Sequence, residues 1–502
     1  MLVIVSDLHL HDGSISQPVD SGRFHLFAER LAEMARHASW RADGGFQPVE
    51  RIDLVLLGDV LDLTSSARWL EGNVRPWDDP WARETSQRVA EIVSGVLRTN
   101  RDSLRILRAL ASEGAIRIPA AMAHPMAMAG HELVQVPVRI HYMVGDADWQ
   151  LHVPGAAYDL IRQQVAHALG LANVHTQPFP HDPLESTELL HALRAHRVLA
   201  RHGDVFDPLA FGEDRDMASL NDAFEIEVIA RFQQELPQVL GEDLPEWIAD
   251  QLPQLSTLRP RLLAPVWLEG LLERGCPTPA LRRVIKRQWD QIVESFLDLE
   301  IVRGAHHLSP IDLVDGLSKA LSFSHRWTGD WSGRILAWIE QLRGAESPSF
   351  VGHALGEPDY RNRRARHIVY GHTHHAETIA LDASFVDTHV LNQVYFNTGT
   401  WQSTQAATRR PGAVQEFIPF EPLSLVAFYQ GDEREGRAFE TWSSLWGIAP
   451  PRNLEGDLLG EDSHSMRESQ AASARGAAPA SRARSPHFGA STGSTQSRGN
   501  RV

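Results

Sequence analysis

The sequence of 502 residues contains one cysteine, Cys276. A single thiol excludes an intrachain disulfide and any metal site built from several thiolates. Lysine is nearly absent as well, since Lys286 and Lys319 are the only two, and the formal net charge is -16. This acidic balance argues against a protein that binds nucleic acid over a broad basic surface.

Long apolar runs are also missing, because no uninterrupted apolar stretch reaches the length of a membrane span. The apolar start, Met1 to Val5, has no basic leader and no small-residue cleavage site after it. We therefore expect no signal peptide and a cytoplasmic location.

Large apolar residues become scarce from about residue 455, where serine, alanine, glycine and arginine dominate. A segment of this composition cannot bury enough apolar surface to offset the entropy cost of ordering it. Between residues 467 and 502 the only acid is Glu468, while arginine recurs. We therefore expect a disordered basic tail over 455–502.

Six short apolar runs, each ending in polar residues, stand out in the remainder of the chain. Runs so short and so rich in valine, isoleucine and leucine favour buried strands over helices. In layered α/β folds, the residues beyond the carboxyl ends of such strands converge on one crevice. The runs occupy residues 2–9, 52–62, 138–148, 196–204, 367–374 and 394–401.

Helical patterns separate these runs and suggest how the chain is divided. We expect a helical insertion over about 63–135, in which the Ala/Met-rich residues 120–135 form a loop or a weak helix. The interval 206–362 has amphipathic patterns and little strand signal, so it predicts a helical cap. The core would then comprise residues 1–205 and 363–454.

Carboxylate and imidazole side chains follow the apolar runs. Asp7 and His9 are two residues apart, a spacing that projects both side chains to one side of an extended strand end. Asp59 follows Gly58, which permits a sharp turn. Such charges gathered at one edge need cations, and mixed nitrogen and oxygen ligands favour manganese, iron, zinc or nickel over magnesium or calcium. The candidate metal ligands are Asp7, His9, Asp59, Asp146, His202, His372 and His374.

In this order, the motifs resemble those of the calcineurin-like metallophosphoesterase superfamily. The His-Gly-Asp motif and the closing Asn397 to Trp401 look most like its UDP-2,3-diacylglucosamine pyrophosphatase-type branch. The resemblance covers the core strands and leaves the insertions and the tail outside it. The motifs are Asp7-Leu8-His9, Gly58-Asp59-Val60-Leu61-Asp62, Gly145-Asp146-Ala147-Asp148, His202-Gly203-Asp204 and Gly371-His372-Thr373-His374.

The resemblance implies an α/β fold, a four-layer αββα sandwich of two mixed β-sheets, with a dinuclear metal site at the carboxyl ends of the strands. Manganese is the favoured metal, with iron, zinc or nickel as alternatives. One ion would be held by Asp7, His9, Asp59 and His374. The other would be held by Asp59, Asp146, His202 and His372, so that Asp59 bridges the two.

The implied activity is hydrolysis of a phosphoanhydride or phosphodiester by a hydroxide that bridges the two metals. The substrate would be a phosphorylated small molecule or a nucleotide-linked compound. Catalytic roles fall to Asp59, Asp146 and His202. Asp62, Asp148 and Asp204 are expected to orient the histidine ligands. Three residues that lie beside these motifs in the sequence are expected to be peripheral to the site, namely His11, Asp12 and His375.

The same motifs are compatible with other functions. A protein phosphatase or a nuclease could share this fold, although the acidic balance weighs against the nuclease. A catalytically degenerate metal-binding scaffold, in which the helical insertion recruits a partner, is a third possibility because a fold does not prove a function.

Two residues depart from the family's usual pattern. The family normally has asparagine at the position of Asp146, and many relatives have a histidine that protonates the leaving group at the position of Ala147. General-acid help of that kind is worth about 10²–10⁴-fold. Its absence disfavours esters with poor leaving groups, whereas a phosphoanhydride releases a stable anion. His375 could supply the proton from a neighbouring loop.

We predict that Asp146→Asn keeps or raises turnover. Removing one carboxylate leaves more positive charge at the metal site and so strengthens its attraction for an anionic phosphate. Turnover with added Mn²⁺ and the metal content of the variant test this directly. A simultaneous loss of metal and activity would contradict the prediction.

Overall fold

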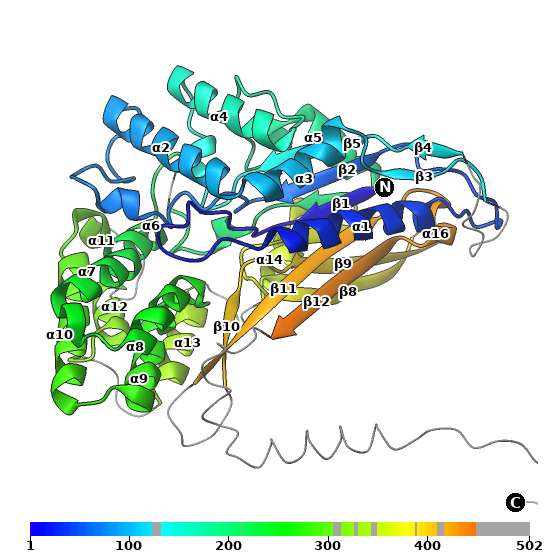
Figure 1. Cartoon of the computed structure of the whole chain (residues 1–502). Helices are drawn as coiled ribbons and strands as arrows, with labels where there is room; N and C mark the ends of the chain where they lie inside the picture. The colour runs from blue at the N-terminus through cyan, green and yellow to red at the C-terminus, as the bar shows by residue number, and fades with distance from the viewer. Residues whose placement is uncertain are drawn as a thin grey trace, which may run out of the picture. The chain divides into compact units, whose positions relative to one another are not determined.

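The chain contains both strands and helices, which gives a mixed α/β fold (Figure 1). The computed structural model describes residues 1–122, 132–212, 214–304, 313–325, 330–342, 349–386, 389–408 and 416–447. The tail expected over 455–502 lies outside the described residues.

A six-stranded mixed sheet is built around three parallel strands. These are β1 (Leu2–Val5), β2 (Ile52–Leu57) and β5 (Val138–Met143), with β2 in the middle. β11 (Phe417–Phe428) runs antiparallel to β1, and β10 (Thr404–Ala407) and β12 (Phe439–Gly447) run antiparallel to β11. The first three expected strands are confirmed, whereas the sequence patterns had not revealed β10, β11 and β12.

A second, four-stranded sheet has the order β6-β7-β9-β8. β6 (Val198–Ala200), β7 (His367–Tyr370) and β9 (His389–Thr398) are parallel, and β8 (Ala376–Val386) pairs antiparallel with β9. These parallel strands confirm the other three expected strands.

Alternate side chains of the first sheet enter two different hydrophobic clusters. Val3 and Leu54 pack in a cluster with residues of α1 (Ser21–Ala38), α2 (Arg83–Thr99), α3 (Arg101–Ser112) and α4 (Ala156–Leu169). Ile4 and Val55 point the other way and pack with residues of the second sheet, including Phe396. The two sheets are therefore joined by a shared apolar layer, which fixes how their carboxyl ends meet.

The described residues within 206–362 form helices and turns and no strand. Most of these helices form one group in Figure 1, around a core that includes Trp267 and Trp289. The helical character expected for 206–362 is thus found in its described part. The helices are α6 (Leu220–Phe224), α7 (Arg231–Leu240), α8 (Glu246–Gln251), α9 (Ala264–Gly275), α10 (Pro279–Leu297), α11 (Glu300–Gly304), α12 (Leu313–Leu321), α13 (Trp331–Leu342), α14 (Val351–Gly356) and α15 (Pro358–Arg361).

The earlier insertion is only partly helical. It contains α2 and α3, but β3 (Arg117–Pro119) and β4 (Leu133–Gln135) then pair as an antiparallel ladder. The expectation of a loop or weak helix is therefore wrong for β4, whose three residues are too few to show a period in the sequence. Residues 123–131 lie outside the described part. The remaining helices are α5 (Thr187–Ala195), α16 (Glu433–Gly436) and short turns of other helical types.

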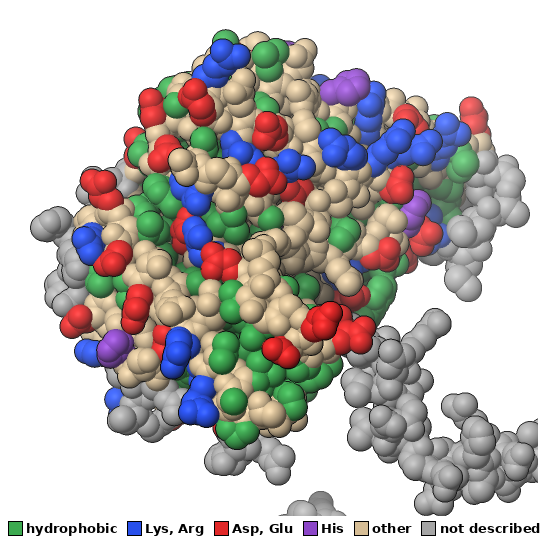
Figure 2. Space-filling view, turned by 60° about the vertical axis from the view of Figure 1, so that its left-hand side comes forward, with side chains coloured by type: hydrophobic (Ala, Val, Ile, Leu, Met, Phe, Trp, Pro, Cys, Tyr) green, Lys and Arg blue, Asp and Glu red, His purple; other side chains and the backbone are tan. Residues whose placement is uncertain are grey.

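No described helix combines the length and the apolar character needed to cross a membrane. Acidic and basic side chains are mixed over the face shown in Figure 2. The face shown there therefore carries no broad basic surface.

We predict that His367 makes the fold sensitive to acid. Its side chain is buried between Phe396, Phe428 and Phe439, and burial lowers its pKa to about 3. Below the unfolded-state pKa of about 6.5, the unfolded chain binds a proton that the native chain excludes, so stability falls as the pH falls. From about pH 6 to 4, the wild type should lose about 1.4 kcal/mol more per pH unit than His367→Leu.

Urea denaturation across this pH range measures the difference. Replacing the exposed His191 with leucine is the control and should leave the pH dependence of the free energy of unfolding unchanged. If the free energy of unfolding changes with pH equally in the wild type and in His367→Leu, the prediction is wrong.

Candidate metal centre

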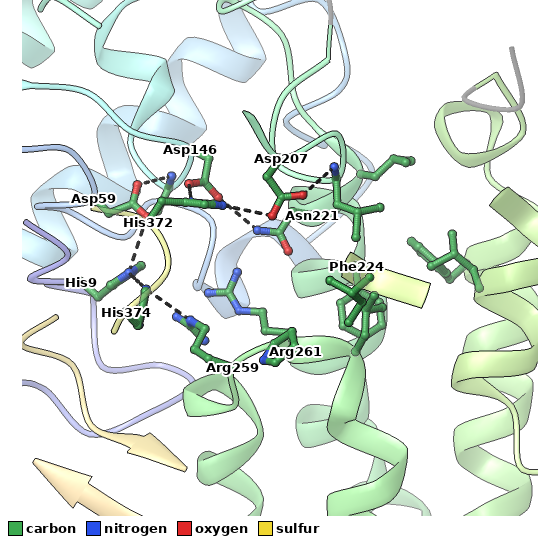
Figure 3. Close-up of a pocket in the computed structure, with 18 residues that line it drawn as sticks. His9, Asp59, Asp146, Asp207, Asn221, Phe224, Arg259, Arg261, His372 and His374 are labelled. Carbon is green, nitrogen blue, oxygen red and sulfur yellow. Dashed lines mark hydrogen bonds and ion pairs between the residues drawn. The ribbon is translucent and has the colours of Figure 1, made fainter. Parts of the chain in front are cut away.

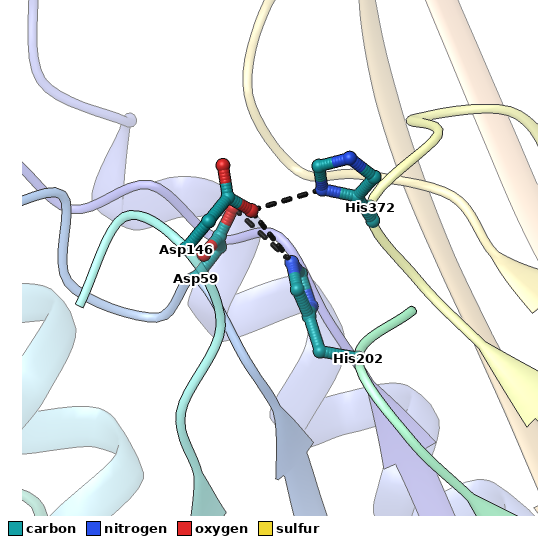
Figure 4. Close-up of side chains that lie close together, drawn as sticks. All are labelled: Asp59, Asp146, His202 and His372. Atoms are coloured by element: carbon teal, nitrogen blue, oxygen red, sulfur yellow. Dashed lines mark hydrogen bonds and ion pairs between the residues drawn. The ribbon is translucent and has the colours of Figure 1, made fainter. Parts of the chain in front are cut away.

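The seven expected ligands lie together where the carboxyl ends of the two sheets meet. They form two groups, and within each group the candidate ligand atoms lie within 4.8 Å of one another. Asp7, His9 and His374 form the first group. Asp59, Asp146, His202 and His372 form the second group, shown in Figure 4. Buried Asp and His side chains with this spacing could hold metal ions.

Asp59 connects the two groups. Its Oδ2 lies 3.5 Å from Nε2 of His9 in the first group and 3.3 Å from Nε2 of His202 in the second. A carboxylate in this position can supply oxygen to ions on both sides, as a bridging ligand does.

The first group contains a buried oxygen that lacks a partner. Oδ1 of Asp7 is buried without a hydrogen bond, 3.3 Å from Nε2 of His374 and 3.8 Å from Nε2 of His9. The two histidine nitrogens are themselves 3.1 Å apart. Three ligand atoms thus face one another around a common point, and a cation there would satisfy the unpaired oxygen.

In the second group, both histidine rings turn a nitrogen toward Asp146. Oδ1 of Asp146 lies 2.9 Å from Nδ1 of His372 and 3.3 Å from Nε2 of His202. The other nitrogen of His202, Nδ1, donates to the Leu57 carbonyl at 2.9 Å. This bond fixes the ring so that its Nε2 lone pair remains available to a cation.

The backbone holds most of these ligands in an unusual conformation. Asp7, His9, Asp59, His372 and His374 all have φ between 47° and 65°, in the left-handed region that side chains other than glycine rarely adopt. The expectation that Asp7 and His9 share one side of an extended strand end is therefore wrong. Their common direction comes from turns after β1, which ends at Val5. Strain of this kind clusters at functional sites.

Two glycines allow the loops to approach closely. A Cβ atom on Gly58 would lie 2.4 Å from Nδ1 of His202, and one on Gly145 would lie 2.3 Å from Oδ1 of Asp59. Gly58 also has φ of +82°, which confirms the sharp turn expected there. Any larger residue at either position would displace a candidate ligand.

The charges at the site shift several pKa values. Burial works to lower the pKa of His9, but hydrogen bonds to Asp62 and Asp7 outweigh it and raise the pKa to about 9. Burial is likewise outweighed at His372, where Asp146 raises the pKa to about 10. These two imidazoles therefore carry protons at neutral pH in the metal-free protein, and a metal ion would displace those protons.

Of the three carboxylates expected to orient histidines, only Asp62 does so. Its Oδ2 lies 3.0 Å from Nδ1 of His9. Asp148 instead accepts hydrogen bonds from Tyr142 and from the Val60 and Gly145 amides, so it organises loop backbone. Asp204 forms an ion pair with Arg215. The expectation is wrong for Asp148 and Asp204 because motif spacing does not reveal which way a side chain turns.

Asp207 performs the role expected of Asp204. Its Oδ2 lies 3.2 Å from Nε2 of His372, on the side of the ring away from Asp146. The sequence offered a signal, since Asp207 lies only three residues after Asp204, but the motif alone did not favour it. Asn221 was also missed, and its Nδ2 donates to Oδ2 of Asp146 at 3.1 Å.

The three residues expected to be peripheral lie away from the two groups. Nε2 of His11 faces the Gln17 carbonyl at 3.1 Å, and Asp12 accepts a hydrogen bond from Ser66. His375 is exposed. None of the three lines the pocket described next.

A pocket of about 760 Å³, including its open mouth, lies against the two groups (Figure 3). On the side formed by the helical insertion it is lined by Arg259, Arg261 and an apolar wall that includes Phe224 and Phe296. Nη2 of Arg261 is buried without a hydrogen bond, and its Nε lies 2.9 Å from Glu225. No motif distinguished these two arginines from the many others in the sequence.

A scan against protein-family models found no match, and a search of curated proteins found none either. The function must therefore be inferred from the motifs and the geometry of the site.

We predict that Asp207→Ala weakens metal binding about 10–100-fold, the usual effect of losing a carboxylate that orients a histidine ligand. Competition with a fluorescent chelator measures this affinity. Asp12→Ala, which removes a nearby carboxylate without ligand contact, is the control and should bind metal like the wild type. Equal affinities for all three proteins would show that Asp207 does not orient His372.

Proposed function

We propose that the protein is a metal-dependent phosphohydrolase that cleaves a phosphoanhydride or a phosphodiester. The observation that carries the proposal is the pair of ligand groups joined by Asp59 at the wall of a pocket. The order of the motifs, which resembles the calcineurin-like metallophosphoesterases, supports the same conclusion.

The proposal includes a dinuclear centre within a four-layer αββα sandwich. The apolar layer between the sheets and the helices packed on β1 and β2 support this architecture. Manganese is the favoured metal because both groups mix carboxylate and imidazole ligands, and iron, zinc and nickel suit them too. Bound in this way, two ions would supply an activated water and neutralise phosphoryl oxygens.

The protein's own contribution is to hold the ligands and to position an anionic substrate. Asp59 lies between the groups, Asn221 fixes Asp146, and Asp207 fixes His372. Arg259 and Arg261 place positive charge beside the acidic cluster (Figure 3). Guanidinium groups bind phosphate oxygens well, so these arginines are suited to orient the substrate.

The pocket offers no obvious proton donor for a leaving group. Ala147 lines it, and among its lining residues every histidine belongs to one of the two ligand groups. His375 is not a lining residue. These facts support a substrate whose leaving group is already a stable anion, such as a phosphorylated small molecule or a nucleotide-linked phosphoanhydride.

The alternatives receive less support. A nuclease of this fold would need to bind a long polyanion. Among the described residues that line the pocket, however, the basic ones are two arginines and the ligand histidines. A degenerate scaffold would have no reason to retain all seven ligands or the strained backbone that presents them.

The proposal predicts Mn²⁺-dependent hydrolysis of bis-p-nitrophenyl phosphate or of a member of a pyrophosphate panel. His202→Ala should reduce the rate at least about 10²-fold, because electrostatic stabilisation by the centre is lost. His191→Gln, at an exposed position, is the matched control and should retain activity. If no substrate is hydrolysed at a metal-dependent rate, the proposal of an enzyme is wrong and the catalytically degenerate metal-binding scaffold becomes the favoured interpretation.

A further inference from the structure

A third cluster of metal-binding side chains lies outside the candidate centre. His152, His181 and Glu185 each offer one ligand atom, and these atoms lie within 4.8 Å of one another. None of the three lines the pocket beside the candidate centre. His152 directly follows η2 (Trp149–Leu151), and Glu185 ends η3 (Pro183–Glu185).

The side chains of this cluster are spaced about as a tetrahedral metal site requires, with one oxygen of Glu185 near each histidine nitrogen. Nε2 of His152 lies 3.4 Å from Nδ1 of His181 and 3.6 Å from Oε2 of Glu185. Nδ1 of His181 lies 3.0 Å from Oε1 of Glu185. Tetrahedral zinc with ligands at about 2.0–2.2 Å separates neighbouring ligand atoms by about 3.3–3.6 Å. Because all three side chains are partly exposed, water can reach the fourth position.

Two of the three ligands are held in place by further hydrogen bonds. Nδ1 of His152 lies 2.6 Å from Oδ1 of Asp216, which leaves Nε2 free to face the cluster. Oε2 of Glu185 accepts the His181 amide at 3.0 Å, and Glu185 also forms a capping box with Asp182. A carboxylate that orients the far nitrogen of a histidine is the usual second partner in a histidine metal site.

We propose that His152, His181 and Glu185 bind one divalent transition-metal ion of the zinc class, at a site separate from the candidate centre. Two imidazoles and one carboxylate with an open position are a donor set that zinc adopts in proteins. Asp216 is the positioning residue for His152.

The location of the site suggests that a bound ion would hold two segments of the chain together. His152 lies on the chain just beyond Asp146 and Asp148, so the ion would tie this loop to η3. Asp216 adjoins Arg215, whose Nη1 lies 3.2 Å from the Gly145 carbonyl. An ion here would therefore hold both sides of the loop that carries Asp146.

Metal counting tests the proposal. The full chain is stripped with a chelator, loaded with Zn²⁺, freed of excess ion by gel filtration and analysed by mass spectrometry of the metal. His152→Gln and Glu185→Gln should each bind one zinc fewer per chain than the wild type, and the exposed control His191→Gln should bind the same number as the wild type. Equal zinc content in all four folded proteins, checked by circular dichroism, would overturn the proposal.

Two further measurements separate this site from the candidate centre. In an Asp7→Asn/His374→Gln background, which impairs the first ligand group, His152→Gln should still remove one zinc per chain. With Co²⁺, the wild type should show a tetrahedral absorption band that His152→Gln reduces, and Asp216→Asn should weaken Co²⁺ binding at this site about 10–100-fold. If the spectra of the wild type and His152→Gln are identical, the cluster is an ion-pair network that holds protons only.

Discussion

Repulsion between buried carboxylates is the constraint on which the site depends. Asp7, Asp59 and Asp146 are all buried at the meeting point of two sheets. Burial works to raise the pKa of Asp7 and of Asp146, but the neighbouring imidazoles outweigh it and lower both values. Asp59 shows the conflict most clearly, because burial and the nearby Asp146 both raise its pKa. The turns, the glycines and the surrounding hydrogen bonds all serve to hold these like charges together.

The framework that sustains this arrangement is the apolar layer between the sheets. Ile4, Val55 and Val369 pack there, each a few residues before the ligands that follow β1, β2 and β7. A rigid layer lets the loops keep unfavourable φ values, since a strained residue persists only when its surroundings fix it. The helical insertion adds a different property, because its arginines and apolar side chains decide what can lie against the ligands.

The sequence revealed the parts of the fold that have a strong local signal. Continuous apolar runs identified all six parallel strands, and the polar residues after them identified the ligands. β8 and β11 escaped notice because polar residues such as Glu377 and Glu421 interrupt their apolar patterns. The partners of the ligands depend on side-chain direction, which spacing does not encode. Asp204 and Asp207 lie three residues apart, yet only Asp207 reaches His372.

The two groups draw their ligands from distant parts of the chain. Asp7 and His9 lie near its beginning, whereas His374 follows the whole helical insertion. On the ribosome, the amino-terminal carboxylates are synthesised long before the last imidazoles. The second group therefore stays incomplete until residue 372 has emerged, and the first until residue 374. A metal ion at these groups would therefore gain its full set of ligands only after the strands on both sides of the helical insertion had come together.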